Sequence, residues 1–157
     1  MIPGSFDPVT RGHVDLIRRA SRIFDRVTVT VMVNIHKAGA VPVDKRTELL
    51  RKACSAFENV TIDRWDGLLA DYMKIRGETT VIRGVRNESD FEQECAVFQA
   101  NRLLNKQIDT VFLPTDPAFA GVSSSVVREV AAFRGDISPF VPEGLSEEIT
   151  SLLSNKE

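Results

Sequence analysis

The chain has 157 residues, enough for one domain with a substantial core, and 43% hydrophobic and 27% charged residues are ordinary for a globular protein. Its formal net charge of -2 argues against a nucleic-acid binder that works by bulk electrostatics, but this charge does not exclude a local basic cleft. No apolar run is long enough for a membrane span, and no basic start precedes an apolar stretch as in a secretory signal. With isolated Cys54 and Cys95, these features predict a cytoplasmic protein with reduced thiols.

The first feature in chain order is a turn rich in strand and helix breakers. Pro3-Gly4 and Asp7-Pro8 predict a tight, extended loop, in which Gly4 lets the backbone approach a ligand closely. Thr10 is the expected N-cap of the following helix, which places Gly12 and His13 in its first turn. The free N–H groups and the dipole of a helix start favour an anion, so the sequence predicts a phosphate site beside His13.

Strands and helices alternate along the rest of the chain. The segment 26–34 is β-branched and apolar almost throughout, which is typical of a strand covered on both faces, and shorter runs at 60–62, 79–83 and 109–113 predict further strands. Apolar residues at helical spacing predict the helices between these strands, and a final helix is expected over 142–153. The expected apolar helix faces are Val14, Ile17, Ala20 and Phe24; Leu49, Leu50, Ala53 and Phe57; Phe91, Cys95 and Phe98; and Val122, Val126 and Val130.

This alternation predicts an α/β fold with a doubly wound parallel sheet, in one domain over residues 1–157. Ligands of such sheets bind beyond the carboxyl ends of the strands, so the residues that follow each strand are the candidates for a site. They include Arg83 and Arg86, which flank Gly84 at a strand end and are poised to bind different anions.

The segment GSFDPVTRGHVDLI resembles the T/H-x-G-H signature of the nucleotidyltransferase superfamily, and the chain as a whole resembles the bacterial phosphopantetheine adenylyltransferase family. A lone T-x-G-H would be weak evidence, but further segments match at the family's order and spacing. They are NIHK at 34–37, IRGVR at 82–86, DFEQE at 90–94 and VSSSVVRE at 122–129. The resemblance implies a Rossmann-like nucleotidyltransferase fold and the transfer of an adenylyl group from ATP to 4'-phosphopantetheine, which gives dephospho-coenzyme A and pyrophosphate. It also implies Mg2+, a homohexamer and coenzyme A as a feedback ligand, without a nucleic-acid or membrane partner.

The same resemblance implies roles for single residues. His13 would donate a hydrogen bond to the α-phosphate, Lys37 would contact the phosphates being joined, and Arg86 would steady the transition state. The residues expected to bind phosphopantetheine are Ser5, Lys37, Leu69 and Arg83. Those expected to bind ATP are Ser5, Phe6, His13, Gly84, Val85, Arg86, Glu94, Phe119, Ala120, Gly121, Val122, Ser123, Ser124 and Ser125. No residue is assigned to a metal, and Asp7 could either brace its loop or lie near Mg2+.

The chemistry of the reaction fits these residue types independently. A phosphate monoester has a second pKa near ~6, so its attacking oxygen is already ionised at neutral pH and needs no base. The site must instead supply positioning and cations for the extra charge on the α-phosphate. That requirement predicts His, Lys and Arg at strand ends without a Ser-His-Asp triad.

The sequence leaves two questions open, namely the start of the first strand and the identity of the function. Family members usually have several apolar residues before the first turn, whereas only Met1 and Ile2 precede Pro3, so either the true beginning is missing or the first strand is very short. The competing functions are another nucleotidyltransferase, acting on nicotinamide mononucleotide or using CTP, and a non-catalytic nucleotide sensor. A sensor predicts the loss of His13 or Lys37, and both residues are present.

Overall fold

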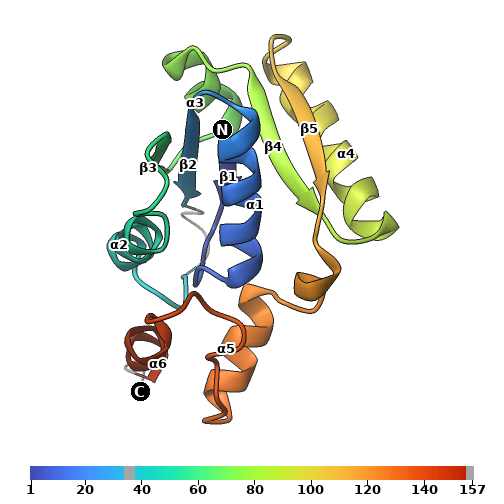
Figure 1. Cartoon of the computed structure of the whole chain (residues 1–157). Helices are drawn as coiled ribbons and strands as arrows, with labels where there is room; N and C mark the ends of the chain where they lie inside the picture. Colours follow the sequence, from blue (N-terminus) through green and yellow to red (C-terminus); the bar gives the residue numbers. More distant parts are fainter. Residues whose placement is uncertain (34–37, 155–157) are drawn as a thin grey trace.

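The computed structural model describes residues 1–33 and 38–154 of the chain (Figure 1). The strands are β1 (Ile2–Gly4), β2 (Val27–Met32), β3 (Val60–Trp65), β4 (Thr80–Val85) and β5 (Asp109–Pro114). The helices are α1 (Arg11–Ile23), α2 (Val43–Ala53), α3 (Leu69–Arg76), α4 (Glu88–Leu104), the 3-10 turn η1 (Pro117–Phe119), α5 (Ser124–Ala132) and α6 (Ser146–Ser154). In the described residues, no helix has both the length and the apolar character needed to cross a membrane.

All strand pairs are parallel, and their order reverses in the middle of the sheet. The ladders run β1-β2-β3 on one side and β4-β5 on the other. The Ile82 N–H donates to the Met1 carbonyl at 2.8 Å, which places β4 beside β1 and gives the order 3-2-1-4-5. In an open parallel sheet the crevice at such a reversal is where ligands bind, here between the carboxyl ends of β1 and β4.

Hydrophobic cores cover both faces of the sheet. Neighbouring residues on a strand point to opposite faces, and Val81 and Ile82 of β4 accordingly belong to different buried clusters. The larger cluster packs α1, α2, α5 and α6 against the sheet, and α1 crosses in front of the strands in Figure 1. The smaller cluster contains α3 residues and Ile108. The predicted doubly wound parallel α/β fold is therefore confirmed.

The first strand is very short, with three residues, as one of the two explanations from the sequence expected. Other predicted elements need correction. The final helix begins at Ser146 rather than at residue 142, because Gly144 has a φ of +77° and the preceding residues form a turn closed by the Leu145 N–H and the Pro142 carbonyl. In α5 the fully buried position is Val127, not one of the three valines on the expected face.

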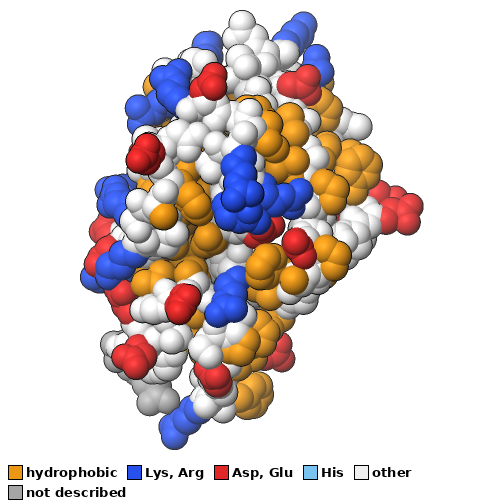
Figure 2. Space-filling model, in the orientation of Figure 1, with side chains coloured by type: hydrophobic (Ala, Val, Ile, Leu, Met, Phe, Trp, Pro, Cys, Tyr) orange, Lys and Arg blue, Asp and Glu red, His pale blue; other side chains and the backbone are white. Residues whose placement is uncertain are grey.

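The expected apolar face of α4 is only partly buried within the chain, with Cys95 and Phe98 half-buried. Phe91 is 44% exposed, and the helix has no fully buried residue. Leu103 and Leu104, at the end of the helix, are 86% and 62% exposed. Figure 2 shows hydrophobic side chains at the surface over β5 and α4.

Candidate active site

Two adjoining cavities open at the reversal point of the sheet. The first has a volume of about 360 Å³ and lies between the loop after β1, the start of α1, the end of β4 and the start of α5. The second has a volume of about 310 Å³ and extends toward α3 and α4. Pro3, Gly4, Ser5, Arg83 and Glu94 line both cavities and form the boundary between them. A ligand in one cavity therefore lies next to a ligand in the other.

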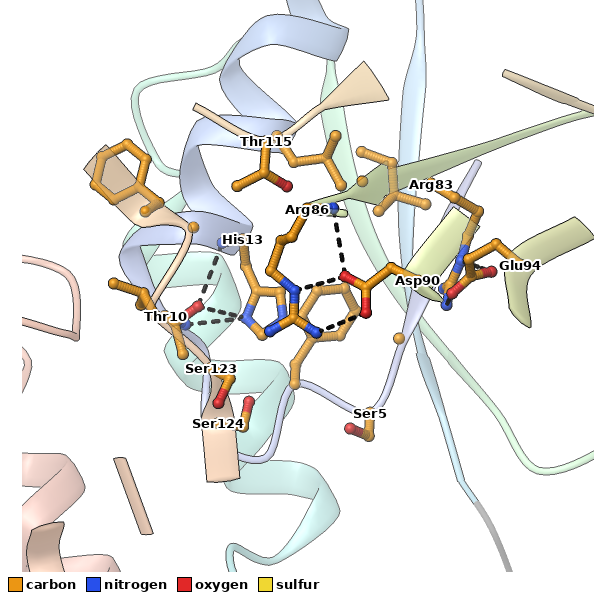
Figure 3. Close-up of a pocket in the computed structure, with 18 of the residues that line it drawn as sticks. Ser5, Thr10, His13, Arg83, Arg86, Asp90, Glu94, Thr115, Ser123 and Ser124 are labelled. Carbon is orange, nitrogen blue, oxygen red and sulfur yellow. Dashed lines mark hydrogen bonds and ion pairs between the residues drawn. The ribbon is translucent and has the colours of Figure 1, made fainter. Parts of the chain in front are cut away.

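His13 lines the first cavity from the first turn of α1 (Figure 3). Thr10 is the N-cap, as predicted, and its hydroxyl accepts a hydrogen bond from the His13 N–H at 3.3 Å. In return, the Thr10 N–H donates to His13 Nδ1 at 3.0 Å. Because Nδ1 accepts this bond, the proton of the neutral imidazole lies on Nε2. The cap thus leaves an N–H donor for the cavity.

The ring of His13 stays neutral at physiological pH. The pKa of the imidazole is lowered from 6.5 to about 4, mainly by burial and in addition by the positive charges of Arg83 and Arg86. Phe6 packs against the ring at 5.0 Å between centroids, edge to face, and is itself buried. The site therefore presents His13 as a neutral, oriented hydrogen-bond donor rather than as an acid.

The two arginines at the end of β4 are each paired with a carboxylate of α4. Arg83 makes a two-pronged contact with Glu94, in which Nε lies 2.7 Å from one oxygen, and its Nη1 donates to the Pro3 carbonyl at 2.7 Å. Arg86 Nε donates to Asp90 at 2.7 Å, and this pairing lowers the pKa of Asp90. Both guanidinium groups line the first cavity, so the expected cations reach the same space.

The first turn of α5 lines the first cavity, and its N-terminus is capped by a serine. Ser123 is the N-cap, and its hydroxyl accepts from the Val126 N–H at 3.2 Å. The Ser124 hydroxyl instead donates to the Pro8 carbonyl at 2.8 Å, which ties α5 to the loop after β1. Since both α1 and α5 begin at this cavity, two helix dipoles favour negative charge there.

Gly4 lines both cavities and packs against Phe6 in the loop after β1. A Cβ on Gly4 would lie 2.9 Å from Cζ of Phe6, so a larger residue here would meet that ring, and the predicted close approach of a ligand stays a prediction. Phe6 has a φ of +46°, and its side chain is buried. Asp7 braces the loop, because its carboxylate accepts from the Ala40 and Val41 N–H groups, each at 2.7 Å.

Most residues expected at the site lie in these cavities. The first cavity is lined by Ser5, Phe6, His13, Arg83, Gly84, Arg86, Glu94, Phe119, Val122, Ser123 and Ser124, and the second by Ser5, Leu69, Arg83 and Glu94. Four expected ATP contacts, Val85, Ala120, Gly121 and Ser125, line neither cavity. Lys37 lies outside the described residues, and its assignment stays a prediction.

Other cavity residues were not among the candidates. Asp90 lies in the first turn of α4 and pairs with Arg86, which stands between β4 and that helix. Thr115 follows β5 directly, as a strand-end residue of this fold should. In the second cavity, Asn101 and Thr110 add polar groups to a largely apolar wall. No signal in one sequence distinguishes these two from surface residues.

The described part of the chain does not offer a ready-made site for a resident metal. Within residues 1–33 and 38–154, no three or more His, Cys, Asp or Glu side chains cluster as metal ligands. Asp7 accepts two N–H bonds and contacts Arg46, so its carboxylate is committed to the loop. Mg2+ often binds substrate phosphates with only one or two carboxylates, and a site of that kind is compatible with the cavity.

Comparisons with known proteins agree with this geometry. The family model described as cytidylyltransferase-like matches residues 1–130. A phosphopantetheine adenylyltransferase of Finegoldia magna is 44% identical over 99% of this chain and 96% of its own length, and one of Thermobifida fusca is 44% identical over 94% and 89%. A solved Plasmodium falciparum nicotinic acid mononucleotide adenylyltransferase, complexed with APC, superposes with a TM-score of 0.66 over 98% of this chain and 94% of its own. At 13% identity it shows the fold alone. The chain belongs to the cytidylyltransferase-like family and, within it, to the phosphopantetheine adenylyltransferases.

Proposed function

We propose that this protein transfers the adenylyl group of ATP to 4'-phosphopantetheine in coenzyme A biosynthesis, with release of pyrophosphate. The observation that carries the proposal is the pair of adjoining cavities, one lined by His13, two arginines and two helix starts, the other largely apolar. The first suits a triphosphate, and the second suits an uncharged arm that leads to a phosphate at the boundary. Relatives that are 44% identical over nearly the whole chain carry the name of this activity.

In this mechanism the protein positions the reactants and stabilises charge, and it uses no general base. The acceptor phosphate is ionised near neutral pH and attacks the α-phosphate of ATP in line with the departing pyrophosphate. The Nε2–H of His13 donates to the α-phosphate, where negative charge increases in the transition state. Arg83 and Arg86 supply positive charge at the boundary and at the first cavity. Lys37 would add a further cation at the phosphates being joined.

We also propose Mg2+ as the cofactor, bound mainly through the phosphates of ATP, where it would neutralise charge on the leaving pyrophosphate. The exposed apolar side chains of α4 support self-association, and we propose the homohexamer implied by the family resemblance. A cytoplasmic location and coenzyme A as a feedback ligand complete the proposal. Coenzyme A contains the same pantetheine arm as the acceptor, so it would compete for the second cavity.

The test is pyrophosphate release from the purified protein with ATP and Mg2+ and one acceptor at a time. The acceptors are phosphopantetheine, nicotinamide mononucleotide and phosphocholine, and CTP replaces ATP in a matched series. Release with ATP and phosphopantetheine alone is the expected result. Release with another pair would identify a different nucleotidyltransferase. ATP binding without release in any series would favour a nucleotide sensor.

A further inference from the structure

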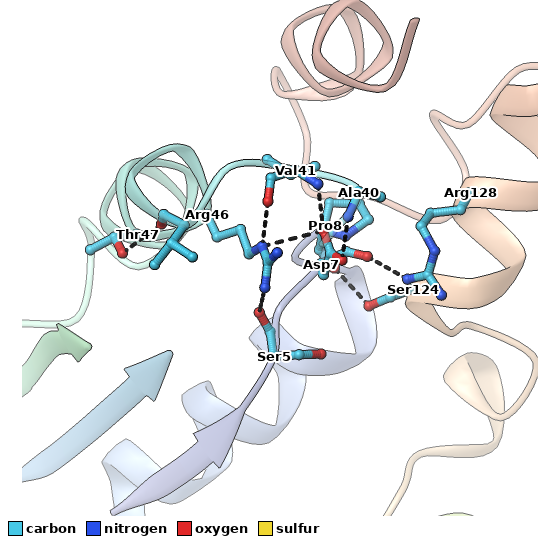
Figure 4. A network of polar contacts seen from close by, with 10 residues as sticks. Ser5, Asp7, Pro8, Ala40, Val41, Arg46, Thr47, Ser124 and Arg128 are labelled. Carbon is cyan, nitrogen blue, oxygen red and sulfur yellow. Dashed lines mark hydrogen bonds and ion pairs between the residues drawn. The ribbon is translucent and has the colours of Figure 1, made fainter. Parts of the chain in front are cut away.

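Behind the cavities, the side chain of Arg46 on α2 lies almost completely buried, with 6% of the residue exposed. Its Nε donates to the Val41 carbonyl at 2.6 Å and lies 3.3 Å from a carboxylate oxygen of Asp7. Its Nη1 donates to the Ser5 carbonyl at 3.3 Å (Figure 4). A Cβ on Gly39 would overlap Nη2, so the chain wraps closely around the guanidinium group.

The partners of this buried pair belong to loops at the site. Asp7 binds the Ala40 and Val41 N–H groups through its carboxylate, and its own carbonyl accepts from Arg128 Nη1 at 2.6 Å. Arg128 lies on α5, whose first turn lines the first cavity. One network thus joins the loop after β1, the segment 39–41 and the start of α5, with Ser5 at its edge.

Stability alone is a weak explanation for such a pair. Burying two charges costs more free energy than an apolar contact of the same size, and replacing buried ion pairs with apolar residues is often neutral or stabilising. Arg46 nevertheless directs its fork of donors at backbone and carboxylate oxygens of separate loops, a geometry that a single ammonium cannot reproduce. What the pair fixes is the relative position of those loops.

We propose that Asp7 and Arg46 are positioning residues for adenylyl transfer, which hold Ser5 at the boundary between the two cavities and fix it relative to the start of α5. This inference rests on the proposed function. Neither side chain lines either cavity, so neither is expected to touch a substrate. A shift of ~1 Å in a positioning group can lower the rate about 10²-fold, and ATP binding at the two helix starts should change much less.

The experiment measures kcat, the KM of each substrate, the Kd of ATP and the melting temperature for Arg46→Lys, Arg46→Met and Asp7→Asn. The matched control is Arg51→Met, an exposed arginine on the same helix. We expect kcat per folded molecule to fall roughly 10- to 10²-fold in Arg46→Lys and Asp7→Asn, with the Kd of ATP within about threefold of wild type. In the double variant Asp7→Asn/Arg46→Met, the fold-decrease in kcat should be smaller than the product of the fold-decreases in the two single variants, because the two side chains act as one unit.

The outcomes separate positioning from a merely structural role. A lowered melting temperature with kcat within about twofold of wild type, measured where the variants are folded, would overturn the inference. If the Arg46 variants do not fold, Asp7→Asn alone tests the inference, and a kcat within about twofold of wild type would again overturn it. A wild-type protein without activity on any acceptor would refute the proposed function, and this inference with it. An active wild type with unchanged kcat in the variants would refute the inference alone.

Discussion

His13 makes two contacts that substitution can separate. Its Nδ1 accepts from the Thr10 N–H at 3.0 Å, which is a structural bond, while Nε2 is left as the donor for the cavity. His13→Ala removes both. Leaving the Thr10 N–H without its acceptor should cost about 1–3 kcal/mol of stability, and losing one transition-state donor should cost about 3–4 kcal/mol, or roughly 10²- to 10³-fold in kcat.

His13→Asn is the matched variant, because its side-chain oxygen can take the place of Nδ1 while nothing replaces Nε2. We therefore expect His13→Asn to recover most of the melting temperature that His13→Ala loses, at about 2–4 °C per kcal/mol for a chain of this size. Its kcat should stay as low as that of His13→Ala. Pyrophosphate release at saturating substrates gives kcat, calorimetry gives the melting temperature, and titration calorimetry gives the Kd of ATP.

The reasoning fails if His13→Asn restores kcat together with stability, because Nε2 would then have no role of its own. It also fails if either variant weakens ATP binding in proportion to the loss of kcat/KM while kcat is kept. That pattern would mean that His13 binds ATP equally in the ground and transition states.

Three further predictions follow from distances and charges at the site. Gly4→Ala places a Cβ 2.9 Å from the Phe6 ring and should cost about 1–3 kcal/mol in denaturant unfolding; an unchanged midpoint would contradict the packing of this loop. NMR should show His13 titrating near pH 4 in the free protein, well below its ordinary 6.5. The neutral ring then contributes stability that is present above about pH 6.5 and is lost as the pH falls toward 4, whereas titration near 6.5 would refute the burial argument. Arg83→Ala removes the partner of Glu94 and a cation at both cavities, so it should raise the KM for phosphopantetheine in initial-rate assays, and an unchanged KM would refute that placement.

The fold and the centre of the site could be predicted from sequence because local signals encode them. Strand–helix alternation fixed the parallel sheet, and a Thr-x-Gly-His spacing predicted the cap at Thr10 and the first-turn position of His13. Position at the carboxyl end of a strand was sufficient to identify Arg83, which lies in β4, and Arg86, which follows it directly. In each case the chemistry depends on residues that are close in the chain.

The contacts that sequence reasoning missed join residues far apart in the chain. The bonds of Asp7 to Ala40 and Val41 span more than 30 residues, so its bracing role could not be separated from a place near Mg2+. Arg46 looked like any helix arginine, because a charge pattern does not reveal which face is buried. The prediction that the apolar face of α4 belongs to the core was wrong for a different reason. Helical periodicity identifies an apolar face, but it does not show whether the same chain or another molecule covers that face.

The pairing of Arg83 with Glu94 and of Arg86 with Asp90 explains how the free protein holds two cations beside a neutral imidazole. Both carboxylates lie on α4, one helical turn apart, and each is within direct contact of its guanidinium group. Unpaired, the two positive charges would repel each other and the phosphate site would be costly to maintain without ligand. Paired, they still lower the pKa of His13, which keeps its ring neutral and its Nε2 proton in place. When a triphosphate binds, the two arginines exchange their carboxylate partners for phosphate oxygens. The stabilising cations are therefore already in place and oriented before the substrate arrives.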